Sequence, residues 1–470
     1  MLELFLDRVI AFVLFWGVWM LAPLLIDAAT AAIYISFMFI YSDQDEDVSS
    51  EDVTYYPRIS IVIPIHNSAD TLGACLQSIF RQTYPVSNIQ IICVNNGTTD
   101  NSFEIYGQIQ HDHPHANLTW VDMDRAGKSI ALNAGLYLMN GEYVINLDSD
   151  AWLDRRAIWN VVAAFEKDHD LVAATGAIHI DKELGKGSSF LDVIHYCEAI
   201  EYLVAFQIGR RYQTFTNKLF TLSGAFSVFR RDVILKTFLY SERTVSEDTD
   251  LTFHIRNQSK GSRLACISNA VAYVEPISSM KKLYSQRVRW QRGQIEVSAM
   301  YGSEWKGFLQ ALASFTGRIL IEDHTLAFSR LTWTFLVPFM YFLGYPLPLV
   351  FAAIGGLILC YMFLDALYFL VAYRGASNSY RKELRRIWWV VFFLPIFRYF
   401  TYWFRLGGIV LTVTEKAGWG VTDPFEQLQK AFRKDINQLK KEVARIRKRL
   451  GLADPEHTIH EQPHGPHHNG

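Results

Sequence analysis

The chain has 470 residues, which is long for one domain and suits a catalytic domain plus a membrane part. Hydrophobic residues make up 50% of it and the mean hydropathy is +0.08, values between those of a soluble enzyme and of a multi-span transporter. The formal net charge of −2 excludes a global positive field that would attract nucleic acid. The five cysteines are scattered without metal-ligand spacing, so neither a disulfide framework nor a zinc site is expected.

The N-terminal region contains a long apolar stretch, residues 9–41, followed by the acidic residues 42–52. A bilayer core needs about 20 apolar residues per helix. The stretch is therefore long for one span and short for two; we favour one long span, and a tight hairpin is the alternative. A cleaved signal peptide fits poorly, because the apolar run exceeds the usual hydrophobic region of such peptides. We assign residues 1–56 to a transmembrane segment and an acidic linker.

Residues 57–300 alternate short apolar runs with helical patterns, which indicates βαβ units and a mostly parallel sheet. The predicted strands span 59–64, 89–94, 118–121 and 143–147, and a helix is predicted from about 127 to 139. In such sheets, ligands bind beyond the carboxyl ends of the strands. Polar residues follow the second and the fourth of these strands, so we expect a binding site at that edge.

A second apolar region begins near residue 331. Residues 331–373 have two prolines in their middle, which predicts two spans joined by a tight turn. The basic loop 374–386 is cytoplasmic by the positive-inside rule. Residues 387–413 are apolar but contain Arg398 and Arg405, whose charges are costly in lipid. We interpret them as a hairpin or a kinked, partly interfacial element that lines a polar path.

The C-terminal part divides into three predicted segments. Residues 301–422 hold interfacial and transmembrane helices, with an amphipathic stretch at 307–328 that suits the membrane surface. Residues 423–450 form a basic amphipathic helix with near-heptad spacing, suited either to another helix, in an oligomer or an accessory subunit, or to anionic lipid. Residues 451–470 are a disordered, His-rich tail.

Two acids follow the predicted strand 143–147 at positions i and i+2, Asp148 and Asp150. At the end of a strand they can direct one carboxylate at a metal ion and the other at a ribose or a neighbouring group. Mg²⁺ and Mn²⁺ prefer oxygen ligands and often share them with substrate phosphates. A polar turn with solvated acids is the alternative, and the preceding buried strand favours the metal site.

Asn96 and Lys128 are candidate donor contacts. Asn96 lies just after the second predicted strand, where its amide can hydrogen-bond a base or a ribose. An ordinary strand-to-helix loop explains it equally well. Lys128 stands at a helix start, where the helix dipole favours anions instead. A phosphate bound at that helix end would resolve the conflict, and a solvated lysine is the alternative.

A second acidic cluster, which includes Glu247 and Asp248, opens a helical run. Acids at a helix start are explained by the dipole alone. A general base must also reach the acceptor hydroxyl, and we choose Asp248 for that role, with Glu247 beside it.

The third polar motif lies in a helix predicted from about 280 to 299 and contains Gln286, Arg289 and Trp290. Arg289 can neutralise a leaving diphosphate. Trp290 offers a flat apolar face to a sugar ring and an N–H to a hydroxyl. A basic amphipathic helix that packs its tryptophan on the core is the alternative.

The order of these motifs, at 127–133, 148–150, 223–226, 247–248 and 286–290, resembles that of membrane family-2 glycosyltransferases. The similarity is strongest to the processive synthases of cellulose, hyaluronan, chitin-like and poly-N-acetylglucosamine polymers. It implies an α/β catalytic domain of the GT-A type, with a Rossmann-like mixed sheet, plus an α-helical transmembrane region.

The resemblance also implies roles for individual residues. Asp150, with Asp148, would hold Mg²⁺ or Mn²⁺, and Asp248 would be the general base with Glu247 next to it. The implied substrate-binding residues are Asn96, Lys128, Asp148, Gly224, Gln286, Arg289 and Trp290. One departure concerns Asn96, which lies in an Asn-Asn-Gly run where the family often has Asp-Asp-Gly. An amide can still bind uracil, but it removes a negative charge.

The expected activity is inverting transfer from a nucleotide-sugar, a UDP-sugar, to build a β-linked exopolysaccharide that is translocated across the membrane. One alternative is transfer of a single sugar to a lipid-linked acceptor. Another is a catalytically silent, membrane-anchored module that binds nucleotide-sugars. The expected partners are the donor, a growing glycan or lipid-linked acceptor, and membrane lipids. The expected location is a bacterial plasma membrane, with several spans and a cytoplasmic catalytic domain.

Overall fold

The computed structural model describes residues 2–40, 55–181, 184–259, 261–301, 315 and 331–414. The predictions made for the acidic linker, for most of residues 307–328, for the basic helix 423–450 and for the tail 451–470 lie outside the described residues.

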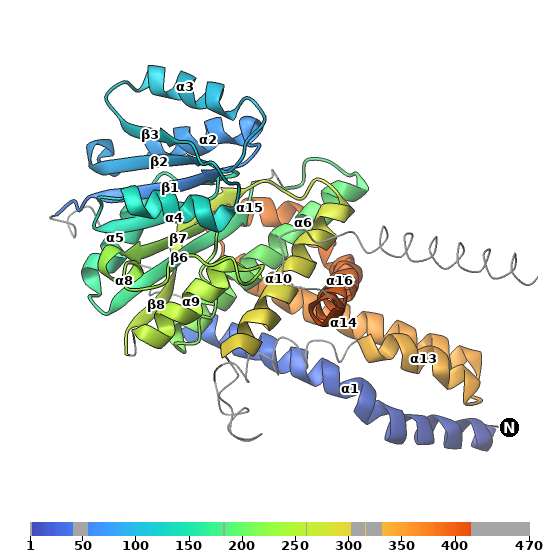
Figure 1. The fold of residues 1–470 in the computed structure, drawn as a ribbon. Helices are drawn as coiled ribbons and strands as arrows, with labels where there is room; N and C mark the ends of the chain where they lie inside the picture. The colour runs from blue at the N-terminus through green and yellow to red at the C-terminus, as the bar shows by residue number, and fades with distance from the viewer. Residues whose placement is uncertain are drawn as a thin grey trace, which may run out of the picture. The chain divides into compact units, whose positions relative to one another are not determined.

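An eight-stranded mixed sheet forms the centre of the α/β domain (Figure 1). Its strand order is β3-β2-β1-β4-β7-β6-β8-β5. The strands are β1 (Ile59–Ile65), β2 (Ile89–Asn95), β3 (Asn117–Val121), β4 (Tyr143–Leu147), β5 (Ala151–Leu153), β6 (Leu171–Ile180), β7 (Phe226–Arg230) and β8 (Arg263–Val274). The four strands predicted from the sequence are β1 to β4, and all four are confirmed.

The first half of the sheet is parallel, because β2 pairs with both β3 and β1, and β1 with β4, in parallel register. Helices cover both of its faces, so all seven residues of β1 are buried. Ile61 and Ile63 pack in the same core cluster as Leu72 of α2 (Ala69–Phe80). Val62 points to the opposite face, into a second cluster with residues of α4 (Lys128–Leu138).

The second half of the sheet contains antiparallel pairs, in agreement with the mixed sheet that the resemblance implied. β7 runs antiparallel to both β4 and β6, and β5 runs antiparallel to β8, whereas β6 and β8 are parallel. In the register of β4 and β7, Leu147 lies opposite Phe226. The carboxyl end of β4 therefore meets the amino end of β7, which brings the segment before Phe226 next to Asp148.

The remaining helices of the catalytic domain flank this sheet. They are α3 (Ser102–Asp112), α5 (Ala157–Lys167), α6 (Phe190–Tyr202), the π-helical stretch η3 (Leu203–Gly209), α7 (Arg210–Phe215), α8 (Arg231–Ile234), α9 (Glu247–Gln258) and α10 (Met280–Tyr301), with a short 3₁₀ turn η2 (Val86–Asn88) before β2. The predicted helices at 127–139 and 280–299 correspond to α4 and α10, and the predicted helical start near 247 corresponds to α9.

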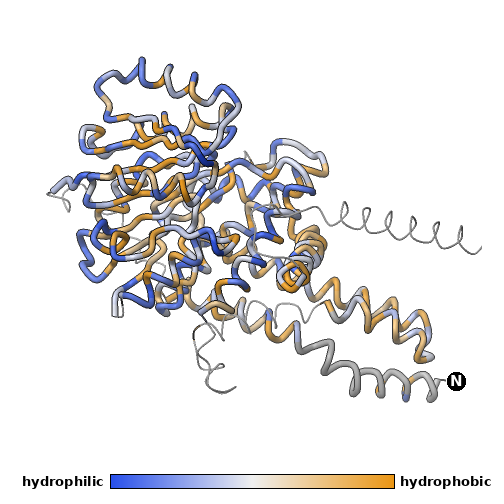
Figure 2. Tube along the Cα trace, viewed as in Figure 1, coloured by the Kyte–Doolittle hydropathy of each residue, from blue (hydrophilic) through white to orange (hydrophobic). Residues whose placement is uncertain are grey.

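The N-terminal apolar stretch is a single helix, α1 (Leu2–Ile40), rather than the alternative hairpin. The second apolar region forms α13 (Thr332–Phe342) and α14 (Leu347–Gly375), joined by a short turn as predicted. Leu24 of α1 packs in one cluster with residues of α13 and α14. Figure 2 shows that α13 and α14 are hydrophobic along most of their length.

Within the described part of the chain, α14 is the one helix that is both long and apolar enough to cross a membrane. Pro23–Met38 and Trp333–Phe342 are shorter apolar segments. The basic loop contains α15 (Asn378–Arg386), and the region after it is kinked, with a 3₁₀ turn η5 (Trp388–Phe392) before α16 (Leu394–Thr414).

The two arginines of α16 both have protein partners. Arg398 forms an ion pair with Asp365 of α14 at 2.9 Å. Arg405 donates from Nε to Gln291 Oε1 of α10 at 2.7 Å. The charge of Arg398 is therefore compensated by α14, and α16 is joined through Arg405 to the helix that carries the third polar motif.

Candidate active site

Polar side chains from α4, from α9 and from the end of β4 converge on Gly224, just before β7. A Cβ atom added to this residue would lie 3.4 Å from Lys128 Nζ, 3.5 Å from Asp248 Oδ2 and 3.9 Å from Asp148 Oδ2. The glycine is itself held by Asn146 of β4, whose Nδ2 donates to the Gly224 carbonyl oxygen at 2.9 Å. The sequence separates these residues widely, and the antiparallel pairing of β4 with β7 brings them together.

Lys128 is the positive centre of this cluster. Its Nζ lies 2.7 Å from Asp148 Oδ1 and 3.4 Å from Glu247 Oε1. Burial alone would lower the pKa of Lys128, but the Asp148 and Glu247 carboxylates raise it well above its ordinary value. Burial raises the pKa of Asp148 and of Glu247, and the Lys128 ammonium opposes that rise. The lysine is therefore a permanent cation at the amino end of α4.

Asp248 is half-buried at the start of α9, and its carboxylate is held on both oxygens. Oδ1 accepts from Ser246 Oγ at 2.8 Å and from the Thr249 N–H at 2.7 Å. Oδ2 accepts from the Gly224 N–H at 3.1 Å and faces the space beside that glycine. A carboxylate oxygen has two lone pairs, so Oδ2 retains one that can accept a proton from a substrate hydroxyl.

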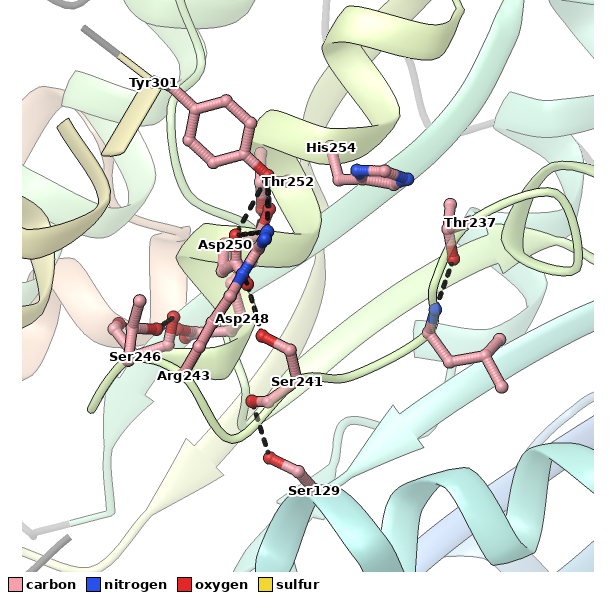
Figure 3. Close-up of polar contacts among 12 residues, drawn as sticks. Ser129, Thr237, Ser241, Arg243, Ser246, Asp248, Asp250, Thr252, His254 and Tyr301 are labelled. Atoms are coloured by element: carbon pink, nitrogen blue, oxygen red, sulfur yellow. Dashed lines mark hydrogen bonds and ion pairs between the residues drawn. The ribbon is translucent and has the colours of Figure 1, made fainter. Parts of the chain in front are cut away.

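Asp250 lies two residues further along α9, and both of its carboxylate oxygens accept hydrogen bonds from protein donors (Figure 3). Its Oδ2 accepts from Ser241 Oγ and from Arg243 Nε, and its Oδ1 accepts from Arg243 Nη2 and from Tyr301 Oη. Burial alone would raise the pKa of Asp250, but these donors lower it overall. This side chain has the role of a structural anchor, and among the two aspartates only Asp248 retains capacity for a substrate.

Asp150 is exposed at the end of the β4 segment. The charges of Asp150 and of Asp248 both contribute to the raised pKa of Asp148, after the larger effect of burial. Both carboxylates therefore act on Asp148 from nearby. Within the described residues, no group of three or more His, Cys, Asp or Glu side chains forms a complete metal cage.

Asn96 has a structural partner at the position where the sequence suggested a donor contact. Its Oδ1 accepts from the Gly127 N–H, and its carbonyl oxygen contacts His66 Nδ1 at 2.9 Å. The amide thus joins the loop after β2 to the amino end of α4. This contact orients the helix start that carries Lys128.

The Gln286–Trp290 segment lies on α10, where it packs against α6 and η3. Gln286 Nε2 donates to Tyr202 Oη at 3.4 Å, while the buried Gln286 Oε1 meets no donor among the described residues. The Trp290 ring packs edge to face on Phe206, with ring centroids 5.4 Å apart. Arg289 is half-buried. The open Gln286 oxygen is consistent with a substrate contact.

α10 is joined directly to the loop that orients Asp248. A Cβ added to Gly293 would collide with the Ser246 side chain. Nearby, Glu296 accepts from the Val245 N–H at 3.2 Å and from Arg292 Nε at 2.7 Å. The absence of a side chain at Gly293 therefore lets Ser246 pack directly on α10. In that position the Ser246 hydroxyl donates a hydrogen bond to Asp248.

Sequence reasoning gave no separate role to Arg287, which shapes the site, whereas the family resemblance had pointed to Glu198 as part of a helix that lines the acceptor channel. Arg287 is 3% exposed, lies 2.6 Å from Glu201 and places its guanidinium 4.5 Å from the centre of the Trp290 ring. Glu198, buried beside this ion pair, has a pKa raised to about 7 by burial. In the sequence, Arg287 is one of several basic residues in an amphipathic helix, and nothing in the pattern distinguishes the buried one.

The catalytic domain matches a known family. Residues 60–238 match the family model described as "Glycosyl transferase family 2". The mannosyltransferase PcManGT of Pyrobaculum calidifontis, solved with GDP-Man and Mn²⁺, is 18% identical and superposes with a TM-score of 0.53 over 77% of this chain and 99% of that one. The first match shows that the chain carries a family-2 glycosyltransferase domain, and the second agrees with a GT-A-like fold.

Curated relatives match about half of the chain. The chain is 27% identical over 240 residues to the poly-beta-1,6-N-acetyl-D-glucosamine synthase of Staphylococcus aureus, covering 51% of this chain and 55% of that one. It is 25% identical over 245 residues to "Probable glycosyltransferase YdaM" of Bacillus subtilis, covering 52% and 56%. The chain thus matches only about half the length of these relatives. The family model also ends before Asp248, so the roles of Asp248 and α10 are argued from the geometry and from the order of the motifs.

Proposed function

We propose that this protein is an inverting, membrane-bound glycosyltransferase that uses a nucleotide-sugar donor to extend a β-linked polysaccharide and to pass it across the membrane. The observation that carries the proposal is the convergence of Lys128, Asp148 and Asp248 on the space beside Gly224. A donor in that space would have its diphosphate near the Lys128 ammonium and its anomeric carbon near Asp248.

In this mechanism Asp248 accepts the proton of the acceptor hydroxyl through Oδ2, while Ser246 and the Gly224 N–H keep the carboxylate oriented. Attack from the face opposite the leaving group inverts the anomeric centre, so an α-linked donor gives a β-linked product. Lys128 stabilises negative charge that develops on the leaving diphosphate, at a helix end that also favours anions.

The acids fit a divalent cation that is shared with the substrate rather than held by protein alone. Asp150 is exposed and Asp148 lies beside it, so Mg²⁺ or Mn²⁺ would bind Asp150 and take its other ligands from Asp148, water and donor phosphates. Bound there, the cation would neutralise charge on the departing nucleoside diphosphate.

The apolar helices support a membrane location with several spans. α1, α13, α14 and α16 pack together or against the catalytic domain, and α14 is long enough to span a bilayer. The basic α15 follows α14 and would lie on the cytoplasmic side, together with the catalytic domain. The name of the staphylococcal relative makes UDP-N-acetylglucosamine the first donor to test.

A donor screen tests the proposal. The full chain in nanodiscs is incubated with UDP-N-acetylglucosamine, UDP-glucose or GDP-mannose, each with Mg²⁺ or Mn²⁺, and release of nucleoside diphosphate is measured. A ladder of β-linked oligomers is expected. A single-sugar lipid product would contradict polymer synthesis but keep the transfer reaction, and binding without release of diphosphate would identify a silent binding module.

A further inference from the structure

One buried arginine near the site has an unused donor. Arg210 begins α7, directly after the π-helical stretch η3, and only 8% of its surface is exposed. Its buried Nη1 meets no hydrogen-bond acceptor, and within the described residues no carboxylate lies within ion-pair distance. A buried charge is costly to fold unless it is paired. The arrangement therefore indicates a partner that is not among the described residues.

Other arginines of the domain are used differently. Arg287 forms an ion pair with Glu201 at 2.6 Å, although its buried Nε has no acceptor among the described residues. The half-buried Arg230 donates to the carbonyl oxygens of Leu171 and Phe165. Each of these guanidinium groups is therefore held by at least one protein acceptor. Arg210 differs because its guanidinium makes no hydrogen bond among the described residues.

The position of Arg210 links it to the catalytic site. Its guanidinium carbon lies 4.5 Å from the centre of the Phe206 ring, and Phe206 packs on Trp290. Burial lowers the pKa of Arg210, and the Asp248 carboxylate is among the groups whose charge opposes that effect. The guanidinium therefore lies on the Trp290 side of the site, within electrostatic reach of Asp248.

The charge balance of the site favours an anionic partner. The single positive charge of Lys128 is shared with Asp148 and Glu247, so it cannot alone balance a substrate diphosphate, which calls for a further cation. A guanidinium presents a planar fork of donors that matches phosphate oxygens. We propose that Arg210 binds a phosphate group of the substrate beside Asp248, an inference that rests on the proposed transferase function. The phosphate belongs either to the leaving diphosphate of the donor or to a lipid-linked acceptor.

Binding measurements with charged and neutral probes test this site. The full chain in nanodiscs is titrated with UDP and with uridine in the presence of Mn²⁺, and separately with a polyprenyl phosphate and the matching polyprenol. We expect Arg210→Met to weaken one phosphate probe by about tenfold or more, while its neutral counterpart changes by less than about twofold. Arg210→Lys keeps the charge without the fork and should give an intermediate loss. A loss for UDP assigns the donor diphosphate, and a loss for the polyprenyl phosphate assigns the acceptor.

Arg256 provides a matched control. It also stacks on a ring, with its guanidinium carbon 4.7 Å from the centre of Phe315, but it donates to the carbonyl oxygens of Asn217 and Leu219. Arg256→Met should lower thermal stability without selective loss of phosphate binding. If Arg210→Met gives the same result as Arg256→Met for both phosphate probes, Arg210 is structural and the inference is wrong. Because binding is measured without turnover, failure of the donor screen would leave this result intact.

Discussion

Replacing Glu198 by glutamine should change how stability depends on pH. Glu198 is 1% exposed on α6, and burial raises its pKa from 4.5 to about 7, against the opposing effect of Arg287. The difference of about 2.5 between these values corresponds to roughly 3 kcal/mol of unfolding free energy. Glutamine has nearly the same shape but does not ionise, so it removes this contribution while leaving the packing in place.

The sign of the effect follows from the protons bound in each state. Between pH 4.5 and pH 7, the unfolded chain has released the Glu198 proton while the folded chain retains it. The unfolded state binds fewer protons over this range, so stability falls as pH rises and levels off above pH 7. In Glu198→Gln the loss of stability from about pH 5 to pH 8 should be smaller than in the wild type by roughly 2–3 kcal/mol.

Denaturant unfolding of the protein in detergent, followed by tryptophan fluorescence at several pH values, measures this difference. Glu104→Gln makes the same chemical change on an exposed face of α3 and serves as the control, with a pH profile that should follow the wild type. Parallel pH profiles for Glu198→Gln and wild type would refute the reasoning, because they would show that Glu198 ionises in the fold as readily as in the unfolded chain.

Three further substitutions separate catalytic from structural roles. Gly293→Ala should push Ser246 away and lower kcat by about tenfold or more, with little change in donor KM. Gly107→Ala is the control, because Gly107 has open space around it, and it should leave the kinetics unchanged. If the two variants changed kcat equally, the positioning role of Gly293 would be contradicted. Lys128→Met leaves two partly buried carboxylates without their cation and should destabilise the fold by about 3 kcal/mol and weaken UDP binding, and unchanged UDP affinity would remove the lysine from the donor site. Asp250→Asn should cost about 2 kcal/mol in denaturant unfolding while retaining transfer, and abolished transfer in a folded variant would assign this residue to the chemistry.

The parallel half of the fold could be predicted because its strands are short and rich in hydrophobic residues. β1 and β4 are fully buried and mostly hydrophobic, each with one polar residue, and the acids after β4 mark the ligand-binding edge. β6 and β8 were missed, since alanine, threonine and glycine interrupt the apolar pattern of β6, and serine and asparagine interrupt that of β8. The antiparallel direction of β7 depends on the course of the preceding segment, which contains α6 and α7. No local sequence pattern encodes that course.

The candidate site, like the fold, could be predicted from the sequence only in part. Motif order was sufficient to nominate Lys128, Asp148 and Asp248, and the structure brings all three to Gly224. The sequence could not distinguish Asp248 from Asp250 on physical grounds, because both fit a helix start. The two aspartates differ in their hydrogen-bond partners, because Arg243 and Tyr301 both donate to the Asp250 carboxylate.

The most direct test of the central claim is a paired measurement on Asp248→Asn, which preserves size and removes the base. The transfer rate and the dissociation constant of UDP with Mn²⁺ are measured on the same preparation. We predict that transfer falls by about 10²–10⁴-fold while the dissociation constant stays within about threefold of the wild type. Transfer at a wild-type rate in a variant that still binds the donor would contradict the assignment of Asp248 as the general base.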